Sequence, residues 1–269
     1  MVIRIRHALL LHLIKEIMMD NFKLYSQYYD LLYQKKNYFQ EVEYVHSLIE
    51  NYFSGNAKEL LDLGSGTGKH GKLFAARGYN VLGLERSTEM VAVANTNKYK
   101  NFNSIQGDIT DFSLNKQFDV VTALFHVISY VNYNQDIEAV FKNVHLHLKP
   151  LGVFIFDVWY SPAVYTQKPV TRIKRLNNDL IELTRIAEPE VDHNANVVTV
   201  NYHIFIKDLN NNQIKEIKEI HPMRHFSIPE IQLYADKYSF EVLKVEEFLS
   251  SNPPADDTWG VCFVLRSNG

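Results

Sequence analysis

The chain has 269 residues, of which 46% are hydrophobic and 22% are charged, and this composition is typical of a globular protein. Its formal net charge is −3, so the totals lack the excess of Lys and Arg that nucleic-acid-binding proteins carry. The single cysteine, Cys262, excludes an intramolecular disulfide and favours a reducing, cytoplasmic environment. No apolar run reaches the length needed to span a bilayer. From the charge we expect no nucleic acid as partner, and from the absence of such a run we expect no membrane.

The N-terminal residues 1–18 differ in character from the rest of the chain. They imitate a signal peptide, but His12 and Glu16 interrupt the apolar run and no small-residue cleavage site follows. We expect an extension that precedes a natural start at Met18 or Met19, with a docked amphipathic helix as the alternative.

Strands and helices are then predicted to alternate. Apolar residues at helical spacing predict a helix over 38–53. Beyond it we expect strands at 59–63, 80–85, 102–106, 118–124 and 152–158, helices at 69–77 and 88–95, and a helical stripe of Ile137, Val140, Phe141, Val144 and Leu148. The strands are apolar throughout, which is typical of a parallel sheet covered by helices on both faces.

The pattern changes over residues 159–225, where extended segments separated by Asn- and Asp-rich turns predict an antiparallel β insertion. Ser227 and Glu230 then predict a capping box that opens a helix through Lys237, followed by two closing strands. We therefore divide the chain into an extension (1–18), a core (19–158 with 226–269) and an insertion (159–225) that would serve as a substrate lid or a dimer surface.

A glycine-rich turn follows the first strand in the stretch LLDLGSGTGKHG. Glycine has no Cβ atom, so a strand, a glycine-rich turn and a helix bring a ligand close to the backbone at a helix N-terminus. A tight turn without a ligand is the plainer alternative. The position of the turn favours a ligand, because it follows the strand where the sheet order is expected to reverse.

Two acidic residues lie at the ends of the next two strands. Glu85 ends the second strand and fits the two hydroxyls of a ribose, whereas Asp108 follows the third strand and fits an exocyclic amine. Each residue alone is better explained as a cap or a solvated loop residue. Together with the turn, they predict a nucleoside whose tail lies over the glycines.

Both NAD and S-adenosylmethionine (SAM) fit this outline. The pyrophosphate fingerprint is GxGxxG, but the spacing here is GxGxG, preceded by Asp62. An acid beside the turn suits a ligand with an ammonium and a sulfonium better than a diphosphate. We therefore expect SAM as the cofactor, with S-adenosylhomocysteine as its product.

At this point the sequence resembles the class I SAM-dependent methyltransferases, through LLDLGSGTG, VLGLERSTEMVAVA, IQGDITDF, FDVVTALFHVISYV and LKPLGVFIFDVW. The resemblance implies an α/β fold with a doubly wound, seven-stranded, mostly parallel, Rossmann-like sheet and an antiparallel β insertion. It also implies that the cofactor contacts Asp62, Gly64, Gly66, Glu85, Arg86, Met90, Asp108, Ile109 and Phe125.

The segments YYDLLYQ, NYFQEVEYV, FIFDVWYSP and HFSIPEIQLYA are similar to the sugar N,N-dimethyltransferases, which methylate the amine of TDP-linked deoxyaminosugars. This narrower resemblance implies that the cofactor also contacts Tyr29 and Tyr38. It implies that the acceptor contacts Trp159 and Tyr160, with Tyr25 as a further candidate. Arg172 lies in a basic stretch that could meet a diphosphate, although a solvated strand face is the plainer alternative.

Three residues are catalytic candidates. Tyr130 stands where the sugar enzymes carry a histidine, and His126 lies four residues earlier; either would accept a proton or orient the amine, or His126 is only a loop residue. Asp157, where the family has glutamate, would hold a hydroxyl or an ammonium. A general base is optional, because part of an amine is neutral near pH 7 and alignment alone supplies roughly 7–11 kcal/mol. Trp259 replaces an expected arginine.

The sequence therefore predicts a SAM-dependent N-methyltransferase for a TDP-linked deoxyaminosugar, and leaves both a monomer and a homodimer open. A methyltransferase for another small amine or hydroxyl, a SAM-binding protein without activity and a nicotinamide oxidoreductase are the alternatives. We expect no metal site, because His145 and His147 point in different directions on a helix.

Overall fold

The structure is a computed structural model that describes residues 31–34 and 36–269. The predictions for Tyr25, Tyr29 and the extension at 1–18 lie outside the described residues. The chain divides into two compact units, which are considered one at a time. The first unit contains the described residues up to Lys36 with 171–188 and 201–219, and the second contains 37–170, 189–200 and 220–269.

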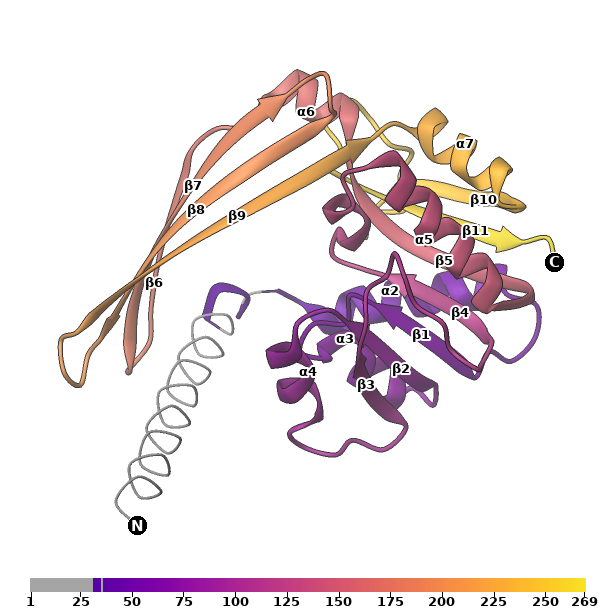
Figure 1. The fold of residues 1–269 in the computed structure, drawn as a ribbon, viewed down its shortest axis with the longest axis horizontal. Coiled ribbons are helices and arrows are strands. Elements are labelled where there is room, and N and C mark those ends of the chain that lie inside the picture. Colours follow the sequence, from indigo (N-terminus) through magenta and orange to yellow (C-terminus); the bar gives the residue numbers. More distant parts are fainter. Residues whose placement is uncertain (1–30, 35) are drawn as a thin grey trace, which may run out of the picture. The chain divides into compact units, whose positions relative to one another are not determined.

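The second unit contains a sheet with the strand order β3-β2-β1-β4-β5-β11-β10 (Figure 1). Neighbouring strands from β3 to β5 are parallel, and β11 is antiparallel to both β5 and β10. The order reverses at β1, so the predicted doubly wound, mostly parallel sheet is confirmed. The strands are β1 (Glu59–Leu63), β2 (Asn80–Glu85), β3 (Phe102–Gln106), β4 (Phe118–Ala123), β5 (Leu148–Tyr160), β10 (Phe240–Glu247) and β11 (Gly260–Ser267).

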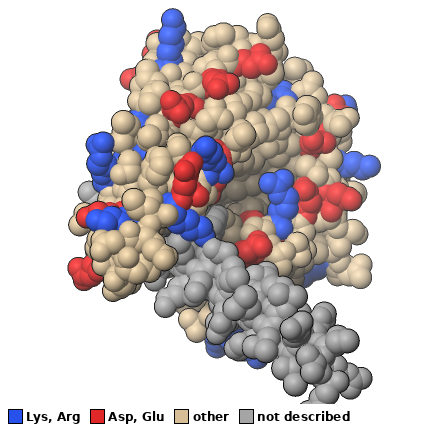
Figure 2. All heavy atoms as spheres, turned by 60° about the vertical axis from the view of Figure 1, so that its left-hand side comes forward, with Lys and Arg blue, Asp and Glu red and all other residues tan. Residues whose placement is uncertain are grey.

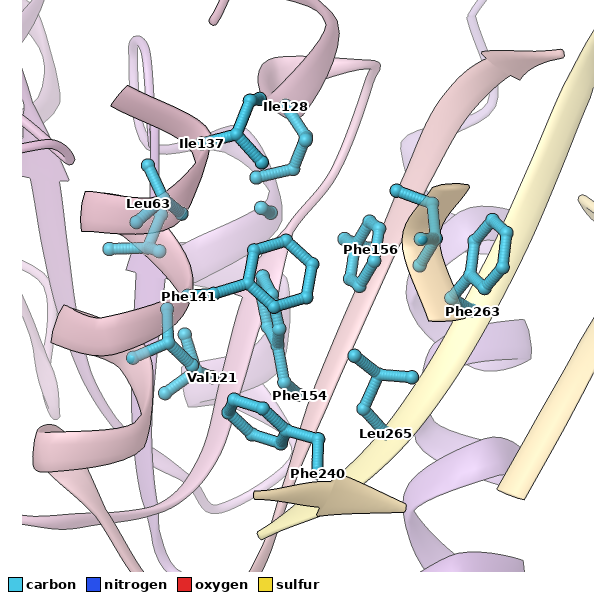
Figure 3. Packing of buried hydrophobic residues seen from close by; sticks show 14 of the residues in the cluster. Leu63, Val121, Ile128, Ile137, Phe141, Phe154, Phe156, Phe240, Phe263 and Leu265 are labelled. Atoms are coloured by element: carbon cyan, nitrogen blue, oxygen red, sulfur yellow. The ribbon is translucent and has the colours of Figure 1, made fainter. Parts of the chain in front are cut away.

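Helices cover both faces of this sheet. One apolar cluster packs side chains of α2 (Tyr38–Tyr52), α3 (Lys69–Ala76) and α4 (Thr88–Asn95) against one face, and a second packs α5 (Asn134–His147) and α7 (Ile228–Lys237) against the other. In β1, Leu60 belongs to the first cluster and its neighbour Leu61 to the second. Figure 3 shows the second cluster, where Phe141 of α5 lies against Phe154 of β5. Burial on both faces explains why β1 and β4 are largely apolar, whereas β3 at the edge of the sheet is partly polar and exposed.

Three local predictions were wrong. Leu148 was placed on the helical stripe, but its extended backbone (φ −86°, ψ 141°) already begins β5. Residues expected to be extended form α6 (Ser161–Gln167), in which proline occupies the first turn and Ala163 and Val164 are buried. The capping box is half formed: the Ser227 hydroxyl accepts from the Glu230 N–H, but the Glu230 carboxylate pairs with Arg224.

The first unit contains strands that neighbour one another in the order β9-β8-β7-β6, with β6 and β7 antiparallel. A small core packs Leu31 and Leu32 against Ile181, Leu183, Ile204 and Ile206. The strands are β6 (Arg172–Asn177), β7 (Ile181–Asp192), β8 (Val197–Asp208) and β9 (Ile214–Phe226), of which the last three also extend into the second unit. In the second unit, the end of β9 pairs with the end of β5 through Trp159–His225 and Tyr160–Phe226.

Charges of both signs are interspersed on the face of the molecule that Figure 2 displays. Within residues 31–34 and 36–269, no helix is long and apolar enough to cross a membrane. A search of the same residues finds no group of three or more His, Cys, Asp or Glu side chains placed to hold a metal ion.

Candidate functional site

The glycine-rich turn joins β1 to α3 at the carboxyl edge of the sheet. Gly64, Gly66 and Gly68 all have positive φ angles, of 63°, 54° and 76°, which favour glycine. A Cβ atom on Gly64 would lie 2.5 Å from a methyl of Val127, so packing within the protein also excludes a side chain there. A Cβ on Gly66 would meet only the sulfur of Met90, at 3.9 Å. The backbone is therefore most open to a ligand at Gly66.

Glu85 lies at the end of β2 and joins two segments of backbone. Its two carboxylate oxygens accept hydrogen bonds from the N–H of Gly66 (2.9 Å) and the N–H of Ser87 (2.8 Å). Each carboxylate oxygen has a second lone pair, so both can also accept from the hydroxyls of a ribose. The residue predicted to bind the ribose thus also shapes the turn.

Asp108 follows β3, as predicted, and caps its own loop. Its Oδ1 accepts from the N–H and the hydroxyl of Thr110, at 2.9 and 2.7 Å. Burial opposes ionisation, but these hydrogen bonds and the charge of Arg86 together hold the pKa of Asp108 below its usual value. An ionised carboxylate here can accept from an adenine amine. Met90 and Ile109 are both half-buried, and Arg86 is exposed.

Asp62 is the most deeply buried of the predicted cofactor residues, with 2% of its surface exposed. Its Oδ1 accepts from the Thr122 hydroxyl at 2.9 Å, and its Oδ2 is buried with no hydrogen-bond partner in the described part of the chain. Burial raises the pKa of Asp62 to about 6, although the charge of His70 and the bond from Thr122 lower it. A buried acceptor without a donor fits a ligand that brings a donor.

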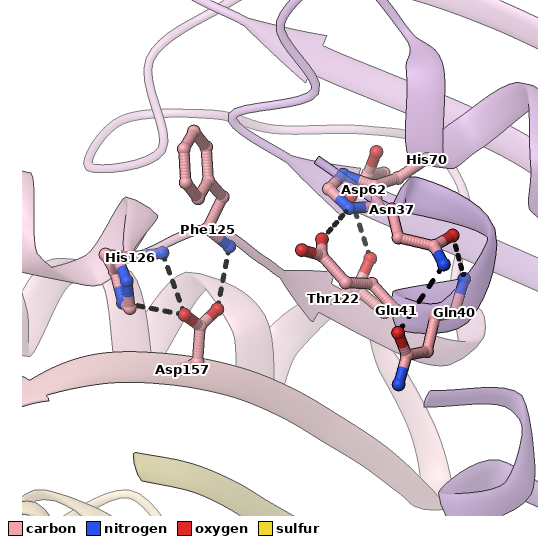
Figure 4. Close-up of polar contacts among 9 residues, drawn as sticks. All are labelled: Asn37, Gln40, Glu41, Asp62, His70, Thr122, Phe125, His126 and Asp157. Carbon is pink, nitrogen blue, oxygen red and sulfur yellow. Dashed lines mark hydrogen bonds and ion pairs between the residues drawn. The ribbon is translucent and has the colours of Figure 1, made fainter. Parts of the chain in front are cut away.

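The sequence interpretation missed two residues beside Asp62. Glu41 of α2 and His70 of α3 are buried and paired, with 2.6 Å between Glu41 Oε2 and His70 Nε2 (Figure 4). The ring of Tyr38 packs edge-on against His70, with the centroids 4.9 Å apart. The predicted cofactor residue Tyr38 is therefore close to the turn. A polar residue on the buried face of each helix was the only signal in the sequence.

The loop after β4 brings Phe125, His126 and Asp157 together (Figure 4). Phe125 and His126 have consecutive positive φ angles, of 68° and 61°, and such a conformation is costly for residues with side chains. Asp157 of β5, 1% exposed, stabilises it by accepting from the N–H of Phe125 (2.7 Å) and the N–H of His126 (3.1 Å). The same carboxylate also lies 2.7 Å from His126 Nδ1, and the two groups form an ion pair when the imidazole is protonated.

Aromatic side chains surround His126 at this end of the sheet. The Trp159 ring meets the His126 ring edge-on at 6.3 Å and the Trp259 ring at 5.9 Å. The Trp259 indole N–H donates to Gln167 of α6. Tyr160 is half-buried, and its N–H donates to the carbonyl of Trp259. The structure therefore brings His126, Asp157 and Trp159 together and adds Trp259.

The remaining candidates lie elsewhere in the chain. Tyr130 ends the 3-10 turn η1 (Val127–Tyr130), is 46% exposed, and contacts His221 Nδ1 through its hydroxyl at 2.9 Å. Arg172 begins β6 of the first unit and is exposed. The catalytic role of Tyr130 and the substrate contact of Arg172 stay predictions.

The residues present fit an adenosyl ligand with a cationic tail. The open backbone at Gly66, the unpartnered Oδ2 of Asp62 and the carboxylates of Glu85 and Asp108 all lie at the carboxyl ends of β1, β2 and β3. Parallel neighbours end at one edge, so these groups share one side of the sheet.

Comparison with known proteins agrees with this geometry. Residues 60–152 match the methyltransferase domain family. A dTDP-3-amino-3,6-dideoxy-alpha-D-glucopyranose N,N-dimethyltransferase of Streptomyces fradiae is 32% identical over 52% of this chain and 55% of its own length. The chain thus spans little more than half of this relative.

Solved structures match over more of the chain. A SAM-dependent methyltransferase from Clostridium acetobutylicum covers 92% of this chain and 99% of its own, with a TM-score of 0.77 and 21% identity. Streptomyces venezuelae DesVI covers 90% and 98%, with a TM-score of 0.76 and 21% identity. Residues 60–152 therefore match a methyltransferase domain family, and the chain has the fold of these SAM-dependent methyltransferase structures.

Proposed function

We propose that this chain is a SAM-dependent N-methyltransferase that acts on the amine of a TDP-linked deoxyaminosugar. Bound SAM supplies a methyl group that its sulfonium activates for in-line displacement. The observation that carries the proposal is the position of His126 and Asp157 after β4 and on β5, beside the edge where Asp62, Glu85 and Asp108 lie. The amine acceptor is supported by the dimethyltransferase relative described above.

The cofactor is held by residues of the second unit. Gly64 and Gly66 give backbone access for the amino-acid tail, and Asp62 accepts from its ammonium. Glu85 accepts from the ribose, and Asp108 from the adenine amine. The remaining contacts come from Tyr38, Arg86, Met90, Ile109 and Phe125. A cofactor contact of Tyr29 stays a prediction from the sequence.

The acceptor amine must lose a proton and point its lone pair at the methyl group. His126 accepts that proton, and the carboxylate of Asp157, 2.7 Å from its Nδ1, attracts the resulting positive charge. Asp157 also fixes the backbone of Phe125 and His126, so the ring is held in one position. Trp159 and Tyr160 contact the sugar nucleotide. The acceptor contacts of Tyr25 and Arg172 stay predictions from the sequence. We further propose a cytoplasmic homodimer.

The test is incubation of the protein with SAM and several TDP-linked 3- and 4-aminosugars, followed by mass spectrometry. We expect masses raised by one and then two methyl groups. The matched control is the TDP-sugar that carries a hydroxyl in place of the amine, which should stay unmodified. Methylation of other small amines or of hydroxyls, with all the aminosugars inert, would refute the proposed acceptor. Absence of S-adenosylhomocysteine binding in calorimetry would refute the whole proposal.

A further inference from the structure

The loop that follows β3 is tied to one turn of α5 at two places. The side-chain amide of Asn143 donates to the carbonyl of Thr110 at 2.9 Å. The N–H of Leu114 donates to Nε2 of His147 at 2.8 Å. Asn143 and His147 are four residues apart on the helix, so they lie on one of its faces. One helical turn therefore holds the loop at residues 110 and 114.

His147 makes its bond to the loop as a neutral ring with the proton on Nδ1. A backbone N–H always donates, so Nε2 accepts from Leu114 and carries no proton. Nδ1 lies 2.7 Å from the carbonyl of Asn143, which accepts its proton. The ring is 6% exposed and packs on the ring of Phe112, with the centroids 4.5 Å apart. Both nitrogens are thus used inside the protein, and the imidazole is an uncharged link between α5 and the loop.

The same loop carries Asp108, the proposed acceptor for the adenine amine. The N–H and the hydroxyl of Thr110 both donate to Oδ1 of Asp108, which leaves Oδ2 to accept from the amine. Asn143 holds Thr110 through its carbonyl, so a continuous series of hydrogen bonds runs from α5 to this carboxylate. The orientation of the carboxylate therefore depends on residues outside the proposed cofactor contacts.

We propose that His147 and Asn143 are positioning residues that hold the Asp108 carboxylate toward the adenine amine of the cofactor; this inference rests on the proposed function. Their effect is on discrimination between bases. With the loop held, Oδ2 of Asp108 meets the amine at a fixed position, and a base without that amine leaves the oxygen unpaired. With the loop released, the carboxylate turns to water, and the two bases bind with more similar affinity.

The experiment compares two ligands by titration calorimetry. S-adenosylhomocysteine carries the adenine amine, whereas its purine analogue has hydrogen in place of that amine alone. The unaltered protein should bind S-adenosylhomocysteine at least about tenfold more tightly than the analogue, which leaves a charged acceptor without its donor. In His147→Leu and in Asn143→Ala, we expect this affinity ratio to fall by at least about threefold, since contacts in one hydrogen-bond network are coupled. Losses of equal size for both ligands, or no loss, would overturn the inference.

Two further variants separate positioning from a general loss of structure. His147→Gln keeps an acceptor oxygen that can reach the Leu114 N–H, so it should keep the affinity ratio within about twofold of that of the unaltered protein. His145→Leu is the matched control, because His145 lies on the same helix but contacts the hydroxyl of Ser267 on β11, at 3.2 Å. We expect it to leave the ratio unchanged. A fall in either variant as large as that in His147→Leu would overturn the inference.

A measurement on the unaltered protein covers the case in which the variants fail to fold. Nitrogen NMR of the histidine rings should place the proton of His147 on Nδ1. A proton on Nε2 would exclude the bond from Leu114 and overturn the inference. Equal binding of the two ligands to the unaltered protein would also overturn it, while the proposed methyltransferase function would stand. If neither ligand bound, the proposed function would be overturned, and the inference with it.

Discussion

The carboxylate of Glu85 is hydrogen-bonded to the backbone N–H of Gly66, with 2.9 Å between Oε2 and the nitrogen. This bond joins the end of β2 to the most open position of the glycine-rich turn. The other oxygen bonds the N–H of Ser87, which caps α4. One side chain thus holds two of the backbone segments that surround the proposed ribose site.

Substitution of Glu85 by Gln should destabilise the ligand-free protein. Glutamine offers one acceptor oxygen, so an amide NH2 would face one of the two N–H groups. We expect a loss of about 1–3 kcal/mol in the free energy of unfolding, measured with urea. Glu89→Gln is the control, because Glu89 is exposed on α4 and its carboxylate accepts from the Ser87 hydroxyl without joining two strand or loop segments. It should change stability by less than about 0.5 kcal/mol. An equal effect of both changes would contradict the prediction.

Asp62 should make the ligand-free protein less stable as the pH rises. Burial raises its pKa from 3.8 to about 6 in the folded state, so the folded protein holds this proton more tightly than the unfolded chain. The stability that the folded protein gains from this proton is fully present below about pH 4. It is lost as the pH rises through 6, and the loss is on the order of 3 kcal/mol. In Asp62→Asn, the fall in unfolding free energy between pH 4.5 and 7.5 should be smaller by about 1–3 kcal/mol. An unchanged pH dependence would contradict this.

Replacement of His126 should slow catalysis without weakening cofactor binding. We expect His126→Ala to lower kcat by roughly 10²- to 10⁴-fold, the usual contribution of a general base, with S-adenosylhomocysteine affinity close to that of the unaltered protein. Tyr130→Phe removes only the hydroxyl that contacts His221 and should retain most activity. The opposite ranking of the two variants would assign the proton-accepting role to Tyr130.

Gly71 should tolerate alanine poorly because of packing. It has an ordinary helical backbone, but an added Cβ would lie 2.3 Å from the ring of Phe102 on β3. We expect Gly71→Ala to cost about 1–3 kcal/mol of stability by urea unfolding. Adding Phe102→Leu should recover part of that loss, because the smaller side chain gives the methyl room. If the double variant lost more unfolding free energy than the two single variants lose together, this account would be contradicted.

The alternation of strands and helices could be predicted because β1 and β2 are short, largely apolar runs between turn residues and helical patterns. The bounds of β1, β2 and β3 match the prediction residue for residue. Helix α6 could not be recognised in this way. Its seven residues are too few to show a helical period, and the tertiary burial of Ala163 and Val164 stabilises it.

The sequence pointed to candidate site residues most directly where they end or follow strands. Glu85 and Asp108 were found because parallel strands end at one edge. The Glu41–His70 pair was missed because it joins two helices whose contact no local pattern specifies. Sequence spacing also could not choose between His126 and Tyr130, since the choice depends on the contact between His126 and Asp157, which belong to different strand ends.

Main-chain hydrogen bonds hold the last two residues of β5 in the fold. Trp159 and Tyr160 pair with β9 in the ladder, and their N–H groups donate to the Ser129 hydroxyl and the Trp259 carbonyl. None of these bonds depends on which side chain stands at either position. If the two side chains contact the acceptor, substitutions at these positions would leave the main-chain bonds of β5 in place, so related enzymes could differ in the molecules they modify while this part of the scaffold is kept.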